Sequence, residues 1–311
     1  TTELEIELNF IKEGLMRTIG QENLIYAYSA KNPVALEVEA GEIFVLETHD
    51  RFTDIKDFSN ILGSDATRIN AVTGAVFIKG AKPGNVLKVE LQKLEVTQRE
   101  GVIVAFPKRG AFGEKIPEPR KKIVPLKKGY AIFNEKIKIP LSPHVGRIGV
   151  APATGEIPTA IPDSHGGNLD NKDFVAGTAI YLPIFHEGAL LGAGDFHALM
   201  GDGESVISGI EIAGQATLRC SVIEDFSLTD PFMVTPEKAM TMASANTLDA
   251  AARKALDNMA ILLSRAHKID YVEAAMLVSI AGDVHVCQLV NPQVTVKVMV
   301  QRSLLPLLFL K

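Results

Sequence analysis

The chain has 311 residues, of which 47% are hydrophobic and 22% are charged, a composition typical of a globular protein with a sizeable core. The formal net charge is -5, which argues against a nucleic-acid partner because such partners bind basic surfaces. Cys220 and Cys287 are too few for a disulfide framework and favour a reducing, cytoplasmic location. No signal peptide is recognisable at the N-terminus, and the apolar tail SLLPLLFLK is too short to span a bilayer, so we expect no membrane partner.

The first half of the chain alternates apolar and polar residues in short runs, the pattern of β-strands. TTELEIELNF predicts an opening strand, and residues 32–50 predict two strands separated by Ala40-Gly41. The second of these runs from Ile43 to Thr48 and ends in His49-Asp50, at a strand end where functional side chains are common.

Residues 71–96 predict a hairpin, with strands at 76–79 and 86–96 around the turn Lys-Pro-Gly-Asn. Two short apolar runs follow, at 102–106 and 130–133. The basic segment 106–122 falls between them and indicates a solvated loop; a lid over the site is the alternative.

The second half adds helices to the strands. Strands are expected at 178–185 and 189–195, with a long β segment over 205–225. Helical spacing predicts a helix over 247–267, with Asn246 as its N-cap, and a second over 271–281 that Gly282 ends. Strands at 284–289 and 294–300 follow, and a terminal strand or packed tail is expected at the end, with a dimer contact as the alternative.

These elements predict a mixed α/β fold that is β-rich, with strands and hairpins through most of the chain and a helical pair near the C-terminus. We expect one domain over residues 1–311. Two sub-lobes are possible within it, a β-rich one over 1–150 and an α/β one over 151–311.

The stretch from Asp163 to Glu211 concentrates acids, three histidines and many glycines, with Lys172 as its one lysine or arginine. This composition suggests a cation site. Asp195 and His197 are two residues apart on a predicted strand and so share a face. The loop HGGNLD can turn sharply at its glycines and bring His165 and Asp170 together.

The turn Gly-Asp202-Gly-Glu204 adds two carboxylates, and Glu204 is our candidate for the base that takes a proton from an ion-activated water. Structural roles are the alternative at each of these positions: Asn168 also suits a turn cap, and a single Asp or His is commonly structural. A turn or structural role is favoured for three further histidines, His144, His186 and His267.

Other chemistries have weaker support in the sequence. It contains no Gly-x-Ser-x-Gly elbow, phosphate-binding loop or dinucleotide fingerprint. Cys220 alternates with Leu218 and Val222, and Cys287 lies between Val286 and Gln288 in a predicted strand, which indicates core positions rather than nucleophiles.

Several runs resemble the acetamidase/formamidase family. They are HGGNLDNKD at 165–173, GALLGAGDFHALMGDGE at 188–204, SGIE at 208–211, and flanking runs at 73–91 and 273–292. The resemblance covers nearly the whole chain. It implies hydrolysis of the carbon–nitrogen bond of short linear amides, formamide or acetamide, to ammonia and a carboxylate through a metal-activated water. It also implies a β-rich α/β fold and a homo-oligomer, with a dimer favoured.

The resemblance also implies a divalent metal, most simply zinc, with calcium as the alternative. Matching motif positions give a site whose expected members are these: metal ligands Asp50, His165, Asp170, Asp195 and His197; catalytic Glu204 and Asp202; substrate-binding Asn168 and Gly167. Met200 stands where many members carry a polar residue, which leaves the amide preference open. Two other functions stay open: a non-catalytic, calcium-stabilised small-molecule-binding protein, and a hydrolase of another C–N compound, such as a cyclic or aromatic amide.

Overall fold

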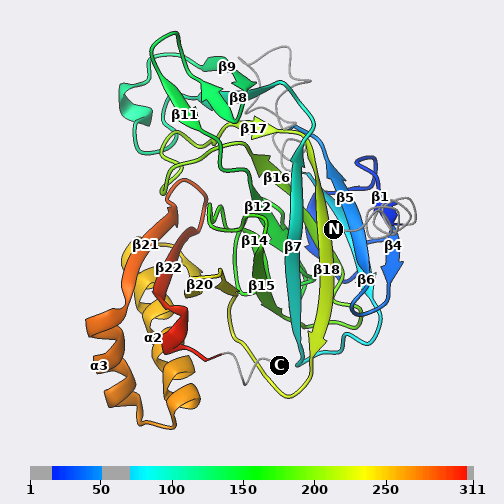
Figure 1. Cartoon of the computed structure of the whole chain (residues 1–311), viewed down its shortest axis with the longest axis vertical. Coiled ribbons are helices and arrows are strands. Elements are labelled where there is room, and N and C mark those ends of the chain that lie inside the picture. Colours follow the sequence, from blue (N-terminus) through cyan, green and yellow to red (C-terminus); the bar gives the residue numbers. More distant parts are fainter. Residues whose placement is uncertain (1–15, 51–70, 307–311) are drawn as a thin grey trace, which may run out of the picture.

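The computed structural model describes residues 16–50 and 71–306. Within them two large β-sheets dominate, and two helices lie near the C-terminal end, α2 (Leu248–His267) and α3 (Tyr271–Ala281). This confirms the predicted β-rich α/β class. Figure 1 shows β7 and β18 running along the long axis, with the helices beside β20 and β22 at one end.

The first sheet has nine strands in the described residues, and all neighbours are antiparallel except β1 and β5. In spatial order they are β1 (Arg17–Ile19), β5 (Ile43–Thr48), β18 (Gly214–Ile223), β7 (Val86–Val96), β15 (Thr178–Pro183), β19 (Phe232–Val234), β20 (Lys238–Ala245), β22 (Val294–Gln301) and β21 (Asp283–Gln288).

The second sheet has eleven strands in the same part of the chain. Its main path is β11 (Lys138–Pro140), β10 (Tyr130–Ile132), β9 (Arg120–Lys127), β8 (Glu100–Ala105), β17 (Glu211–Ile212), β16 (Leu191–His197), β12 (His144–Gly149) and β14 (Gly166–Asn168). β6 (Val72–Ile78) joins it beside β16 and also pairs with β2 (Leu24–Ile25) and β4 (Leu36–Val38). A separate pair joins β3 (Ala27–Ser29) to β13 (Glu156–Pro158), and two short 3₁₀ helices are η3 (Gly113–Lys115) and η4 (Arg302–Leu304).

The main hydrophobic core draws on both sheets. Phe44 and Val89 come from the first sheet, Ile148 and Phe196 from the second, and all four are buried. A second core lies where α2 and α3 cover β20 and β22, with Met259 of α2 and Val298 of β22 both fully buried. Burial of this apolar surface stabilises the fold and fixes the strands that carry the site.

The predicted hairpin at residues 71–96 is wrong. Its turn forms, since Asn85 N–H donates to the Lys82 carbonyl at 3.1 Å. However, β6 pairs with β16, β2 and β4, whereas β7 pairs with β18 and β15 in the other sheet. Turn residues reverse the chain but do not choose the partner of a strand that is buried on both faces.

Two smaller differences concern element ends. Thr247, not Asn246, is the N-cap of α2, because its side chain accepts a hydrogen bond from Ala250 N–H at 3.2 Å. Both residue types cap helices well, so the sequence did not separate them. The long β segment expected over 205–225 is two strands in different sheets, β17 and β18, and residues 205–210 form a loop.

The basic segment between β8 and β9 is largely exposed, as expected of a solvated loop, although β9 begins within it at Arg120. It also lies against the turn that carries Glu204, because Ala111 N–H donates to the Ser205 carbonyl at 2.8 Å. The alternative of a lid over the site stays a prediction.

Strands from before and after residue 150 alternate in both large sheets: β6 pairs with β16, and β7 lies between β15 and β18. One domain, with or without sub-lobes, stays a prediction. The predicted opening strand at 1–10 and the tail residues 307–311 lie outside the described residues. Leu305, just before them, is buried.

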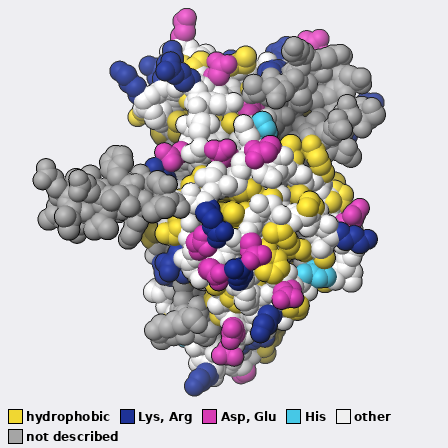
Figure 2. Space-filling view, turned by 90° about the vertical axis from the view of Figure 1, so that its right-hand side faces the viewer, with side chains coloured by type: hydrophobic (Ala, Val, Ile, Leu, Met, Phe, Trp, Pro, Cys, Tyr) yellow, Lys and Arg dark blue, Asp and Glu magenta, His cyan; other side chains and the backbone are white. Residues whose placement is uncertain are grey.

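The face drawn in Figure 2 interleaves acidic and basic side chains. Ion pairs at the surface of the described residues include Arg17 with Glu42 at 2.6 Å and Lys79 with Glu39 at 2.8 Å. Among the described elements, no helix combines the length and the apolar character needed to cross a membrane.

Candidate functional site

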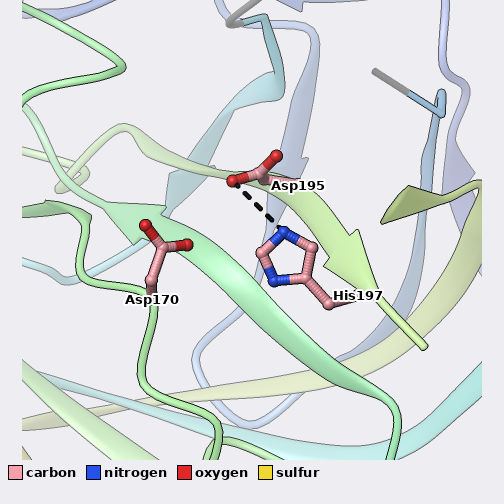
Figure 3. Close-up of side chains that lie close together, drawn as sticks. All are labelled: Asp170, Asp195 and His197. Carbon is pink, nitrogen blue, oxygen red and sulfur yellow. Dashed lines mark ion pairs between the residues drawn. The ribbon is translucent and has the colours of Figure 1, made fainter. Parts of the chain in front are cut away.

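β16 carries two acid–base side chains toward one point. Asp195 and His197 face each other, with 4.0 Å between Asp195 Oδ2 and His197 Nε2 (Figure 3). The strand is not regular here. Asp195 has a φ of 58°, and the pairing with β12 skips from Val145↔Phe196 to Arg147↔Gly194. The register with β12 is the same on both sides of this gap, so the positive φ of Asp195 is a local departure from the strand.

Asp170 reaches the same point from the turn after β14, and in Figure 3 its carboxylate points toward Asp195 and His197. Its backbone N–H donates to the Gly146 carbonyl at 3.0 Å, and Asn291 Nδ2 donates to its Oδ2 at 3.1 Å. A Cβ on Gly146 would lie 2.6 Å from Asp170 Oδ1 and 3.1 Å from Asp195 Oδ2. Glycine at 146 therefore leaves open the space between the two carboxylates.

Two glutamates complete the cluster. Glu211 of β17 pairs with His197 in register, and its Oε1 lies 3.1 Å from His197 Nε2. Glu204 is buried on the turn after β16. Ligand-type atoms of Asp170, Asp195 and His197 lie within 4.8 Å of one another, and so do those of His197, Glu204 and Glu211.

The surroundings of the two buried histidines of the site shift their pKa values in opposite directions. His144 Nδ1 donates to the Ser142 carbonyl at 2.9 Å, so His144 Nε2 accepts the hydrogen bond from His197 Nδ1 at 3.3 Å. Burial and the charge of His197 lower the pKa of His144 to about 3. Burial disfavours charge on His197 as well, but the Glu211 carboxylate outweighs it and raises the pKa of His197 to about 10.

The carboxyl groups are crowded and desolvated. Burial, followed by the charge of Asp195, raises the pKa of Asp170 to about 6. Burial, followed by the charge of Asp170, raises the pKa of Glu204 well above its usual range. Arg147 is buried nearby, 3.4 Å from Asp195 Oδ2. Buried acids in this excess over cations favour the binding of a further positive charge.

The donor set fits a divalent ion. His197 Nδ1 donates to His144, so Nε2 is the ring nitrogen that could bind an ion, in place of the proton that it shares with Glu211. Oxygens of Asp195 and Glu211 lie 4.0 and 3.1 Å from it, and ligands at about 2.1 Å from a tetrahedral ion lie roughly 3.4 Å apart. Gly146 keeps the space between the carboxylates open. These buried Asp, His and Glu groups could therefore hold a metal ion.

Two of the expected metal ligands lie outside both groups of converging donor atoms. His165 is fully buried, its ring packs edge-on against Tyr28 at 5.0 Å between centroids, and neither ring nitrogen has a hydrogen-bond partner among the described residues. Burial lowers the pKa of His165 to about 4. Asp50 follows β5 and lines a surface hollow with Gln98 and Arg99.

The expected substrate-binding and second catalytic residues have structural partners. Asn168 Oδ1 accepts from Arg147 Nε at 2.8 Å. Gly167 has a φ of 90°, and a Cβ there would lie 2.5 Å from the Ile161 carbonyl oxygen. Asp202 accepts from Lys297 Nζ at 3.2 Å and lies 3.2 Å from Lys172 Nζ. No direct role in chemistry follows from these contacts.

Sequence reasoning did not assign Glu211, Arg147 or Asn291 to the site, and it read His144 as structural. Glu211 lay within the SGIE run, and antiparallel pairing of that run with the DFH strand would have placed it beside His197. Arg147 and Asn291 gave no local signal, because their partners are 21 and 121 residues away.

A buried carboxylate–imidazole cluster on a strand end of a β-rich fold defines a candidate hydrolase with a cation site. The family model described as Acetamidase/Formamidase matches residues 20–160 and 153–300. The chain belongs to the acetamidase/formamidase family.

Two solved structures are close to this one. The acetamidase from Bacillus halodurans has a TM-score of 0.88 and 38% identity, covering 92% of this chain and 97% of that one. The predicted acetamidase/formamidase from Thermoanaerobacter tengcongensis has a TM-score of 0.90 and 38% identity, covering 95% and 99%. A putative formamidase from Schizosaccharomyces pombe is 26% identical over 281 residues, 70% of this chain and 68% of the relative. The chain is therefore an amidohydrolase of short amides.

Proposed function

We propose that the chain hydrolyses the C–N bond of short linear amides, formamide or acetamide, with a divalent ion and a water molecule. The observation that carries the proposal is the convergence of Asp170, Asp195 and His197 beside Glu204 in a buried, acid-rich space. Family membership supports the amide as substrate, and the donor set supports the ion.

Asp170, Asp195 and His197 would hold the ion, with Glu211 beside His197 as a further donor. A bound zinc ion supplies Lewis acidity, which polarises a carbonyl and brings the pKa of a water near neutrality. We favour zinc because an imidazole is among the donors, whereas calcium prefers oxygen alone. Zinc-edge or calcium-edge anomalous scattering from a metal-loaded crystal distinguishes the two.

Glu204 is proposed as the base. Its carboxylate takes the proton of the attacking water and returns a proton to the amide nitrogen as ammonia leaves. Burial, followed by the charge of Asp170, raises the pKa of Glu204. Arg147 orients Asp195, and His144 fixes the His197 tautomer that leaves Nε2 toward the site.

Ammonia release from formamide and acetamide by the metal-loaded protein tests the function. Glu204→Gln preserves shape and removes the base, so we expect at least a 100-fold lower kcat with metal content unchanged. Glu224→Gln, at an exposed glutamate, is the matched control and keeps full activity. Full activity in metal-loaded Glu204→Gln would show that another group is the base.

The same assay separates the alternative functions. Turnover of cyclic or aromatic amides but not of acetamide would favour another C–N substrate. A protein that a chelator destabilises, yet that turns over no amide, would favour a calcium-stabilised binding role.

A cytoplasmic location and a homodimer are also proposed. The two cysteines are buried and unbridged, which supports a reducing compartment. Apolar side chains exposed on α3, including Met276 and Ile280, support self-association. Light scattering of the purified protein measures the subunit number.

A further inference from the structure

Lys297 is a lysine with almost no exposed surface, set in the middle of β22. Its ammonium contacts three side chains: Asp173 Oδ2 at 2.6 Å, Asn171 Oδ1 at 3.1 Å and Asp202 Oδ1 at 3.2 Å. A buried lysine persists where several acceptors compensate its lost hydration. The three acceptors therefore define a specific position for this side chain.

These acceptors come from two different segments of the candidate site. Asn171 and Asp173 follow Asp170 within three residues, on the connection between β14 and β15. Asp202 precedes Glu204 by two residues, on the turn after β16. One ammonium thus joins the segment that carries Asp170 to the segment that carries Glu204.

Lys297 itself is held firmly. β22 pairs with β20 and β21 on its two sides, placing Met242 and His285 opposite Lys297. The turn with Asp202 is tied to the same region, since Gly203 N–H donates to the Cys287 carbonyl at 2.9 Å. A central strand is a rigid support for a side chain that must fix the spacing of two turns.

On the segment that follows Asp170, the Asn171 side chain has few strong hydrogen-bond partners apart from the Lys297 ammonium. Asn171 Nδ2 lies 3.2 to 3.6 Å from three thioether sulfurs, which are weak acceptors and hold the amide only loosely. They belong to Met233, Met240 and Met242. The strong bonds that the side chains of Asn171 and Asp173 make outside their own turn are therefore those from Lys297.

We propose that Lys297 is a positioning residue for amide hydrolysis, whose ammonium fixes the spacing between the Asp170 and Glu204 segments so that both acids face His197. The inference rests on the proposed roles of Asp170 and Glu204. Lys297 does not touch the reacting atoms; it acts through Asp173 and Asp202.

The first variant is Lys297→Met, which keeps the length of the side chain and removes its charge. With the link lost, divalent-metal affinity, measured by competition with a chromogenic chelator, and kcat at saturating metal each fall roughly 10- to 100-fold. Lys254→Met removes a comparable ion pair, between Lys254 and buried Asp230 at 2.5 Å, on the helical side of the fold. It leaves metal affinity and kcat unchanged, whatever stability it costs.

A second substitution that restores the thermal midpoint of Lys297→Met distinguishes a positioning role from a general contribution to stability. Lys297→Met with Asp173→Asn removes the carboxylate left unpaired, so the thermal midpoint recovers while metal affinity stays low. Recovery of metal affinity together with the midpoint would overturn the proposal. If Lys297→Met does not fold, Asp202→Asn, at a partly exposed residue, cuts one side of the link; metal affinity falls several-fold if the proposal holds, and unchanged affinity overturns it.

Metal binding by Asp170→Asn distinguishes a failure of the positioning role of Lys297 from a failure of the proposed metal site. Lost metal binding in Asp170→Asn but wild-type affinity in Lys297→Met overturns the positioning role alone. Wild-type metal binding in Asp170→Asn overturns the proposed site on which that role rests.

Discussion

Gly146 shows how one missing Cβ shapes the site. The space beside it is bounded by Asp170 Oδ1 and the backbone and side chain of Asp195, all within 3.1 Å of where a Cβ would lie. The neighbouring glycine at 201 differs, because nothing lies within 4 Å of a Cβ placed there. Gly146 therefore has a steric reason to be glycine that Gly201 lacks.

Gly146→Ala is expected to weaken metal binding roughly 10-fold or more, since the methyl group displaces the Asp170 and Asp195 carboxylates. Calorimetric titration with zinc measures the affinity. Gly201→Ala is the matched control and retains wild-type affinity. Equal affinities in both variants would place the ion elsewhere.

His144 acts on the site through one hydrogen bond. Its Nε2 accepts from His197 Nδ1, which holds the ring with Nε2 toward the acids. His144→Phe keeps a ring but removes the acceptor, so we expect metal affinity and kcat to fall roughly 10- to 100-fold. His186→Phe serves as control, because His186 donates to the Pro152 carbonyl instead; a similar loss in both variants would mean a general packing effect.

At the scale of elements, α2 depends on its cap. The Thr247 hydroxyl accepts from Ala250 N–H, whereas Asn246 is not the cap residue. Thr247→Ala should therefore lower the free energy of unfolding by about 1 kcal/mol, measured by urea denaturation. Asn246→Ala should change it much less, and the reverse order would restore Asn246 as the cap.

The strands that carry the site lie in the sheet in an order that differs from their order in the sequence. β16 brings Asp195 and His197, and its neighbours β12 and β17 bring His144, Arg147 and Glu211. The connection after β14 adds Asp170. The backbone ladder between adjacent strands holds these side chains in position relative to one another.

For the whole molecule, the proposed ion would link metal binding to stability, because the buried acids that would hold it come together only in the folded chain. A ligand that binds only the folded state at 100 times its Kd adds about 2.7 kcal/mol. Treating the metal-loaded protein with a chelator should thus lower its thermal midpoint by several degrees, and zinc should restore it. Calorimetry of Asp195→Asn provides the control, because its midpoint should respond far less to the chelator.

The sequence by itself determined much of the local structure. The exact span of β7, the β5 span and the end of α3 at Gly282 were predicted because alternation, helical period and end signals are local. It also singled out Asp170, Asp195, His197 and Glu204, whose motif spacing within the chain is short. Its acid-rich composition indicated a cation site before any fold was known.

Only the tertiary structure decided which elements meet. It assigned β6 and β7 to different sheets, placed Glu211 against His197, and brought Asn291 to Asp170 from 121 residues away. It also packed the His165 ring against Tyr28, and it placed the Lys297 ammonium between the turns that carry Asp173 and Asp202. The physical reason is that strand pairing and buried charge compensation are long-range: they depend on which surfaces pack together, and no local period encodes that choice.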